Sequence, residues 1–199
     1  MSVVAKALDR YVEMRSRAFA WREGLPWVAK AGLAVGFACL TGLMAQLRIP
    51  LPHTPVPVTG QVFAVLMCGA LLGGAWGGAS QTFYVALGAA GVTWFTGMNG
   101  GLCVLRGYTG GFLLGFVAAA FLIGWATQRW PSMRRPLPLC ALMLGAVGVI
   151  YLLGAVQFQA VAHTDLKDTI AKAVAPFIMW DVAKALLASV LAAALLPKE

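Results

Sequence analysis

The chain has 199 residues, of which 60% are hydrophobic and only 11% are charged, and its mean hydropathy is +0.81. Soluble globular domains carry about 25% charged residues, so this composition excludes that class and indicates one integral membrane domain. The formal net charge of +8 gathers in a few short segments and not on one basic face, which argues against nucleic acid as a partner.

The first 26 residues are polar and precede the first long apolar stretch. Five basic residues lie there, and no small-residue cleavage pattern of a signal peptide follows them. We therefore expect residues 1–26 to form a basic, amphipathic tail on the cytoplasmic side. A membrane domain that binds a substrate is expected over residues 27–199.

Six apolar stretches follow the tail, and each is a candidate membrane-spanning helix. They cover residues 27–47, 58–72, 79–91, 110–128, 137–157 and 175–196. The second and third are short, and we expect the glycine-rich residues 73–78 to form a tight turn between them. With the N-terminus inside, nine Lys and Arg residues, Lys198 among them, fall on the inner side and four on the outer side. The positive-inside rule therefore predicts an all-α protein with six transmembrane helices and both termini in the cytoplasm.

Small residues recur every fourth position in the first apolar stretch, at Ala34, Ala38 and Gly42. Such a ladder lets two helices approach closely. Two interpretations remain open: packing within the chain, or docking against another membrane subunit.

Two of the expected outer segments have compositions suited to covering a ligand. Residues 49–61 contain four prolines, which fix φ and remove amide donors, so we expect a stiff, extended lid. Residues 96–111 are rich in glycine, which allows close approach of the backbone to a ligand. The third outer segment, residues 159–174, is polar and amphipathic and is expected to be an interfacial connector.

The last apolar stretch contains two charged residues, Asp181 and Lys184. They are three residues apart and therefore project from one face of a helix. A charge in hydrocarbon costs about 3 kcal/mol even on lenient insertion scales, so such a pair normally faces a bundle interior or a polar cavity. Because Pro176 is expected to start this helix, the pair should lie in the outer leaflet, below the lids. We expect a cavity for a polar ligand; the alternative is an ion pair that only locks helices together.

Four more polar residues are candidates for the same site. Asn99 and Arg106 lie in the glycine-rich segment, and Gln61 and Tyr84 lie at or within the second and third apolar stretches. Each has an ordinary alternative role: turn formation for Asn99, solvation for Arg106, and bonds between helices for the other two.

Several kinds of chemistry have no support in the sequence. It contains no G-x-x-x-x-G-K-[ST] loop for ATP, and no H-E-x-x-H, G-x-S-x-G or carboxylate pair of a hydrolase. The four cysteines are scattered and the two histidines are isolated, so we expect neither a metal site nor a cofactor. A capture protein is expected, not an enzyme. If it transports a solute actively, another protein supplies the energy.

Five blocks follow one another along the chain in a recognisable order. They are Ile49-Pro-Leu-Pro with Pro55-Val-Pro-Val-Thr-Gly-Gln61, Gly69-Ala-Leu-Leu-Gly73, Leu87-Gly-Ala-Ala-Gly91, Gly107-Tyr-Thr-Gly-Gly111-Phe-Leu-Leu-Gly-Phe116, and Pro176 with Asp181-Val-Ala-Lys184. These blocks resemble the BioY family, the biotin-binding S components of energy-coupling factor (ECF) vitamin transporters. The resemblance runs from about residue 27 to the C-terminus. Tyr108 departs from it, because proline is expected at that position.

The resemblance implies a six-helix S-component bundle in the cytoplasmic membrane of a prokaryote. It implies high-affinity capture and uptake of biotin, in an outward-facing pocket closed by the loops after helices 1 and 3. The implied partners are a transmembrane coupling protein, on which the ladder Ala34-x-x-x-Ala38 would dock, and ATPase subunits. The family's acidic and basic pair falls on Asp181 and Lys184, and its polar loop residues fall near Asn99 and Arg106.

The chemistry of biotin suits these residues. Asp181 can accept the N–H groups of the ureido ring, and Arg106 or Lys184 can pair with the carboxylate tail. We expect Phe63, Tyr84 and Trp180 to shield the apolar body. Two alternatives stay open: an S component for another vitamin, or a membrane structural or assembly subunit with Asp181–Lys184 as a helix-locking ion pair.

Overall fold

The structure, a computed structural model, describes residues 3–197. Residues 1, 2, 198 and 199 lie outside the description, as do the side chains of residues 3–8 and 18, so the predicted inner charge of Lys198 is not tested. The elements in chain order are α1 (Val3–Gly24), α2 (Trp27–Gln46), β1 (Arg48–Ile49), β2 (Val58–Thr59), α3 (Gln61–Leu72), α4 (Gly74–Ala89), α5 (Leu102–Arg106), α6 (Gly110–Arg129), the 3₁₀ helix η1 (Pro131–Arg134), α7 (Pro136–Ala162), α8 (Leu166–Ala173) and α9 (Ala175–Leu195). The predicted all-α character of the membrane domain is thus confirmed, with one small hairpin added.

Four helices are long and apolar enough to cross a membrane: α2, α6, α7 and α9. The other two predicted spans fold as shorter helices. With a rise of 1.5 Å per residue, the 12 residues of α3 extend roughly 18 Å and the 16 residues of α4 roughly 24 Å, less than a hydrocarbon core of about 30 Å.

The outward faces of the long helices carry large apolar side chains, which suits contact with lipid and not with water. Leu43 on α2, Leu152 on α7 and Met179 on α9 are each more than 60% exposed. The interior contains mostly alanine, valine and aromatic residues, and its polar side chains are few. A water-soluble monomer rarely exposes so much apolar surface, so this is the surface of a membrane protein.

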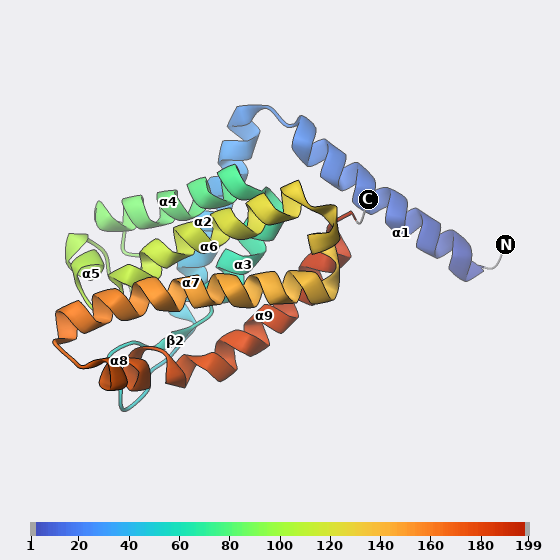
Figure 1. The fold of residues 1–199 in the computed structure, drawn as a ribbon. Coiled ribbons are helices and arrows are strands. Elements are labelled where there is room, and N and C mark those ends of the chain that lie inside the picture. The colour runs from blue at the N-terminus through green and yellow to red at the C-terminus, as the bar shows by residue number, and fades with distance from the viewer. Residues whose placement is uncertain (1–2, 198–199) are drawn as a thin grey trace.

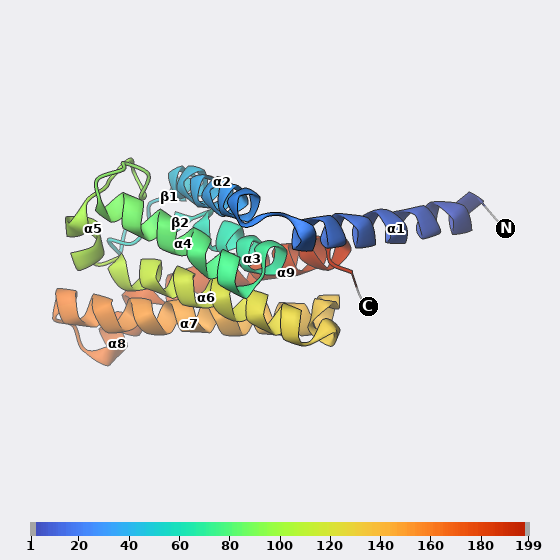
Figure 2. The same cartoon turned by 90° about the horizontal axis from the view of Figure 1, so that it is seen from above.

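The helices form one elongated bundle with different structures at its two ends. In Figures 1 and 2, α6 and α7 run side by side along its length, α4 packs on the other side of α6, and α2 packs on α4. The hairpin, α5 and α8 gather at one end. The C-terminus and α1 lie at the opposite end. The segments predicted as lids and connector therefore share one end of the bundle.

The N-terminal helix α1 is attached to the bundle through a stacked cation cluster. Two guanidinium groups lie over the Phe19 ring, with Arg22 Cζ 4.1 Å and Arg134 Cζ 4.9 Å from its centroid. Arg134 Nε also donates to Thr127 O at 2.8 Å. Burial, and secondly the like charge of Arg22, lowers the pKa of Arg134. The cluster holds the C-terminal half of α1 against η1 and the end of α6.

The small-residue ladder of α2 faces the inside of this chain. Ala34 and Ala38 are fully buried, and Ser80 Oγ of α4 donates to Ala34 O at 2.7 Å. A Cβ added to Gly42 would lie 3.0 Å from Cβ of Trp94. The sequence left open whether this ladder packs within the chain or docks on another subunit. At these three positions the side chains pack within the chain.

Glycines bring the short helices α3 and α4 unusually close to α6. The predicted turn over residues 73–78 is wrong: the turn is made at Gly73, with φ of +84°, and α4 already begins at Gly74. The remaining glycines lie inside the helix, where Gly77 packs on the backbone of Gly69 in α3. They are there because a Cβ would hold the helices apart.

We expect Gly69→Ala to destabilise the bundle. The new Cβ would lie 2.5 Å from O and 3.0 Å from Cα of Ala120, so a backbone must shift, at a cost of about 1–3 kcal/mol. Thermal unfolding of the detergent-purified protein measures the effect. Gly145→Ala on α7 is the matched control, because no heavy atom lies within 4 Å of its Cβ position. Equal melting temperatures for the two variants would contradict the packing described here.

Candidate functional site

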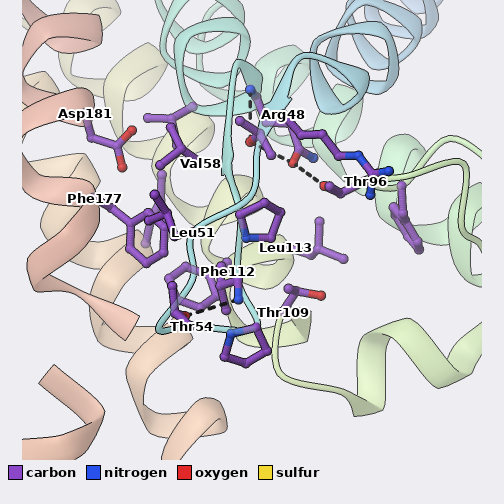
Figure 3. A pocket seen from close by; sticks show the side chains of 18 of the residues that line it. Arg48, Leu51, Thr54, Val58, Thr96, Thr109, Phe112, Leu113, Phe177 and Asp181 are labelled. Carbon is purple, nitrogen blue, oxygen red and sulfur yellow. Dashed lines mark hydrogen bonds between the residues drawn. The ribbon is translucent and has the colours of Figure 1, made fainter. Parts of the chain in front are cut away.

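A cavity of about 330 Å³ lies at the loop end of the bundle, a volume in the range of small-molecule sites. Its lining comes from the hairpin, the loop before α5, the first turns of α6, and the facing sides of α7 and α9. The residues that line it are Arg48, Pro50, Leu51, Thr54, Pro55, Val56, Pro57, Val58, Thr59, Gln61, Val62, Phe95, Thr96, Asn99, Val104, Thr109, Phe112, Leu113, Phe116, Ile150, Tyr151, Phe177, Asp181 and Lys184. Fourteen of these 24 residues are apolar and ten are polar or charged, and Figure 3 shows part of this lining from close by.

The predicted charged pair lies in the wall of this cavity. Lys184 Nζ donates to Asp181 Oδ1 at 2.7 Å, and the hydroxyl of Tyr151 on α7 donates to Asp181 Oδ2 at 2.7 Å. Asp181 is only 4% exposed. A carboxylate so buried needs charged or hydrogen-bonding partners, and here each oxygen has one. The sequence did not indicate Tyr151, because a tyrosine in an apolar helix has many ordinary roles.

Gln61 and Tyr84 form a second polar group beside the cavity. Gln61 lines the cavity, and its Nε2 donates to the Tyr84 hydroxyl at 2.8 Å. Its Oε1 accepts from Thr59 Oγ1 at 3.0 Å and from Thr96 Oγ1 at 3.1 Å. Tyr84 itself is fully buried, is not among the lining residues, and donates to Trp94 O. This network joins the hairpin, the loop before α5 and α4 at one buried amide.

The proline-rich segment folds over the cavity as a hairpin and not as a single extended strand. Its two short strands pair antiparallel, with Arg48 opposite Thr59 and Ile49 opposite Val58. Six of the eight residues between the strands line the cavity, namely Pro50, Leu51, Thr54, Pro55, Val56 and Pro57. Three prolines of this segment therefore form part of the cavity wall, and Figure 3 shows Leu51 and Thr54 of the same segment from close by.

The glycine-rich segment contributes one of its two predicted residues. Asn99 lines the cavity, and its Nδ2 donates to Thr96 O at 2.9 Å. Arg106, at the end of α5, is exposed and is not among the lining residues. The loop is held by Gln46 of α2, whose Nε2 donates to Trp94 O and whose Oε1 accepts from the backbone N–H of Met98.

The aromatic residues around the cavity differ from those expected. Phe63, Tyr84 and Trp180 are absent from its lining, and Trp180 is 41% exposed on the outside of α9. Phe95, Phe112, Phe116 and Phe177 take their place. Arg48 is a further lining residue that the sequence did not single out, because it was counted only as a charge on the outer side. Hydrophobic periodicity alone does not tell which of many aromatic side chains face a cavity.

Comparison with known proteins assigns the chain to a family. The sequence model of the BioY family matches residues 14–198. The chain belongs to the BioY family. A probable biotin transporter BioY of Methanothermobacter thermautotrophicus is 41% identical over 143 residues, which cover 67% of this chain and 89% of the relative. The biotin transporter BioY of Thermotoga maritima is 36% identical, over 82% of this chain and 91% of its own.

A solved structure shows the same fold for this BioY-family chain. The crystal structure of the S-component for biotin from an ECF-type ABC transporter superposes with a TM-score of 0.77 at 25% identity. The match covers 83% of this chain and 89% of the other. The resemblance stated from the sequence blocks is thereby confirmed, and the S-component-like bundle is the architecture that surrounds the cavity.

We expect Lys184→Met to lower stability by leaving the buried Asp181 carboxylate without its cation, at a cost of about 3 kcal/mol or more. The double variant Asp181→Asn/Lys184→Met should recover much of that loss, because it buries no charge. Thermal unfolding in detergent measures both. Lys172→Met is the control: it breaks an exposed pair with Asp168 and should change little. A double variant less stable than Lys184→Met would contradict this account of the pair.

Proposed function

We propose that this chain captures biotin with high affinity from outside the cell and takes part in its uptake as the S component of an ECF-type transporter. One observation carries the proposal: a chain of the BioY family encloses a cavity of about 330 Å³ with a buried carboxylate, Asp181, in an otherwise largely apolar wall. The BioY family consists of transporter components and not of enzymes, and the proposed role is one of binding.

The cavity wall complements each part of biotin. The ureido ring presents two N–H donors, which a carboxylate accepts well, and Asp181 is the carboxylate in the lining. The thioether ring and the methylene chain are apolar and suit Phe112, Phe116 and Phe177. Asn99 and Gln61 are the amides within reach of the ligand's polar atoms.

The position of the cavity supports uptake from the outside. The charge distribution favours both termini in the cytoplasm, and with that orientation the hairpin and the cavity would lie at the outer side of the cytoplasmic membrane. We count α3 and α4 as spans together with the four longer helices, which gives the six-helix topology. Their short lengths suit helices whose outer ends stop below a covering loop.

Transport would require other subunits, because the sequence contains no P-loop for ATP. We propose a transmembrane coupling protein and ATPase subunits as partners. Since Ala34, Ala38 and Gly42 are buried, a partner helix would meet the other side of α2, where Gly32 and Gly36 have no heavy atom within 4 Å of a Cβ position. Small residues on that side would allow a close approach.

We expect purified protein to bind biotin in isothermal titration and Asp181→Asn to bind it at least 10-fold more weakly, since a hydrogen bond to a charged group contributes about 1.5–3 kcal/mol. Asp168→Asn, which alters an exposed carboxylate on α8, should leave the affinity unchanged.

The same titration decides between the alternatives. Saturable binding of thiamine, riboflavin or niacin in place of biotin would identify an S component for another vitamin. Binding of none of them, with Asp181→Asn altering only the melting temperature, would favour a structural subunit in which the pair locks α9 to itself and to Tyr151.

A further inference from the structure

The charges that line the cavity do not balance. Its lining contains three ionised side chains: Asp181, Lys184 and Arg48. The first two form an ion pair at 2.7 Å and neutralise each other. The remaining charge is positive and belongs to Arg48, which comes from β1 of the hairpin.

Arg48 forms no side-chain hydrogen bond or ion pair with any residue between 3 and 197, the part of the chain that the structure describes. Its five donors are therefore available to a ligand. Its backbone is fixed by pairing with Thr59, and its side chain runs towards Thr96 on the neighbouring loop (Figure 3). Arg48 Nη1 occupies the space that a Cβ on Gly97 would need, and Asn99 Nδ2 lies 3.4 Å from the same point. Glycine at position 97 thus makes room for the guanidinium beside the Asn99 amide.

We infer that Arg48 recognises the carboxylate tail of the ligand and sets the orientation in which it binds. A guanidinium forks onto a carboxylate through two parallel hydrogen bonds, and the adjacent Asn99 amide offers a further donor. This inference rests on the proposed capture of biotin. In this orientation the carboxylate tail lies where the hairpin meets the loop before α5. The ureido ring lies at the opposite side of the cavity, next to α7 and α9. Figure 3 shows Arg48 and Thr96 on one side of the hairpin and Asp181 and Phe177 on the other.

The other cations are less suited to the tail. Lys184 is already bound to Asp181, and its transfer to a ligand would remove the cation from a carboxylate that is 4% exposed. Arg48 and Arg106 are both exposed, but only Arg48 lines the cavity. Among the described residues, Arg48 is the cation of the lining that has no carboxylate of its own.

The test compares biotin with its methyl ester, whose tail is uncharged, by isothermal titration into wild-type protein and Arg48→Ala. We expect Arg48→Ala to weaken binding of biotin by about 10- to 100-fold and binding of the ester by less than about threefold. Lys167→Ala, which removes an exposed cation of α8 that does not line the cavity, is the control and should change neither. Equal weakening of both ligands would overturn the inference by showing a structural role, and so would an unchanged affinity for biotin.

A charge reversal adds a test that loss of folding cannot imitate. Arg48→Glu should prefer the amine-tailed analogue norbiotinamine over biotin, which reverses the wild-type preference. If Arg48→Ala does not fold, Arg48→Lys decides: it keeps the charge but not the fork, so biotin should bind more weakly and the ester unchanged. Failure of the wild type to bind biotin would reject the proposed function and this inference together. Normal wild-type binding with no reversal in Arg48→Glu would reject the inference alone.

Discussion

A carboxylate buried in an apolar helix bundle needs hydrogen-bond donors, and the rest of the site depends on how this need is met at Asp181. Its two oxygens are satisfied by Lys184, one turn along α9, and by Tyr151 on α7. The first bond is local and would form in any α9 helix. The second joins two helices and so fixes the facing sides of α7 and α9, where the cavity lies. The Asp181 carboxylate is therefore available to a polar ligand and also positions the helices that form the cavity wall.

The two loops that cover the cavity also contain buried polar groups that need hydrogen-bond partners. Here side-chain amides supply the partners, whereas at Asp181 a charged group does. Gln46 on α2 donates to the backbone of the loop at Trp94 and Phe95 and accepts from Met98, a residue with φ of +59°. Gln61 contacts the hairpin through a side chain, because its Oε1 accepts from the Thr59 hydroxyl. Irregular backbone has few partners of its own, and Gln46 at the end of α2 supplies them to the second loop. Each loop is thus held mainly to a helix end, with the Thr96–Gln61 bond as a link between them.

The sequence alone predicted those site residues whose relation depends only on neighbouring positions in the chain. Asp181 and Lys184 stood out because two charges three residues apart in an apolar stretch share one helical face. Tyr151 could not be found this way, because its partner lies 30 residues further along the chain and only the tertiary fold brings them together. Glycine over residues 73–78 was taken as a turn for a related reason. Glycine permits turns and close helix packing equally well, and only the neighbouring helix α6 decides between them.

The two ends of the cavity differ in the secondary structure that forms their walls. The Asp181 end is made by long helices, whereas the Arg48 end is carried by a hairpin whose strands have two residues each. Strands so short contribute little stability alone, so the hairpin depends on its bonds to the end of α2 and, through Gln61, to the neighbouring loop. A ligand whose ring is held by the helices and whose tail is held by Arg48 and Asn99 joins the hairpin to the second loop. Ligand and lid then stabilise each other reciprocally, because any ligand that binds the closed form more tightly also favours closure.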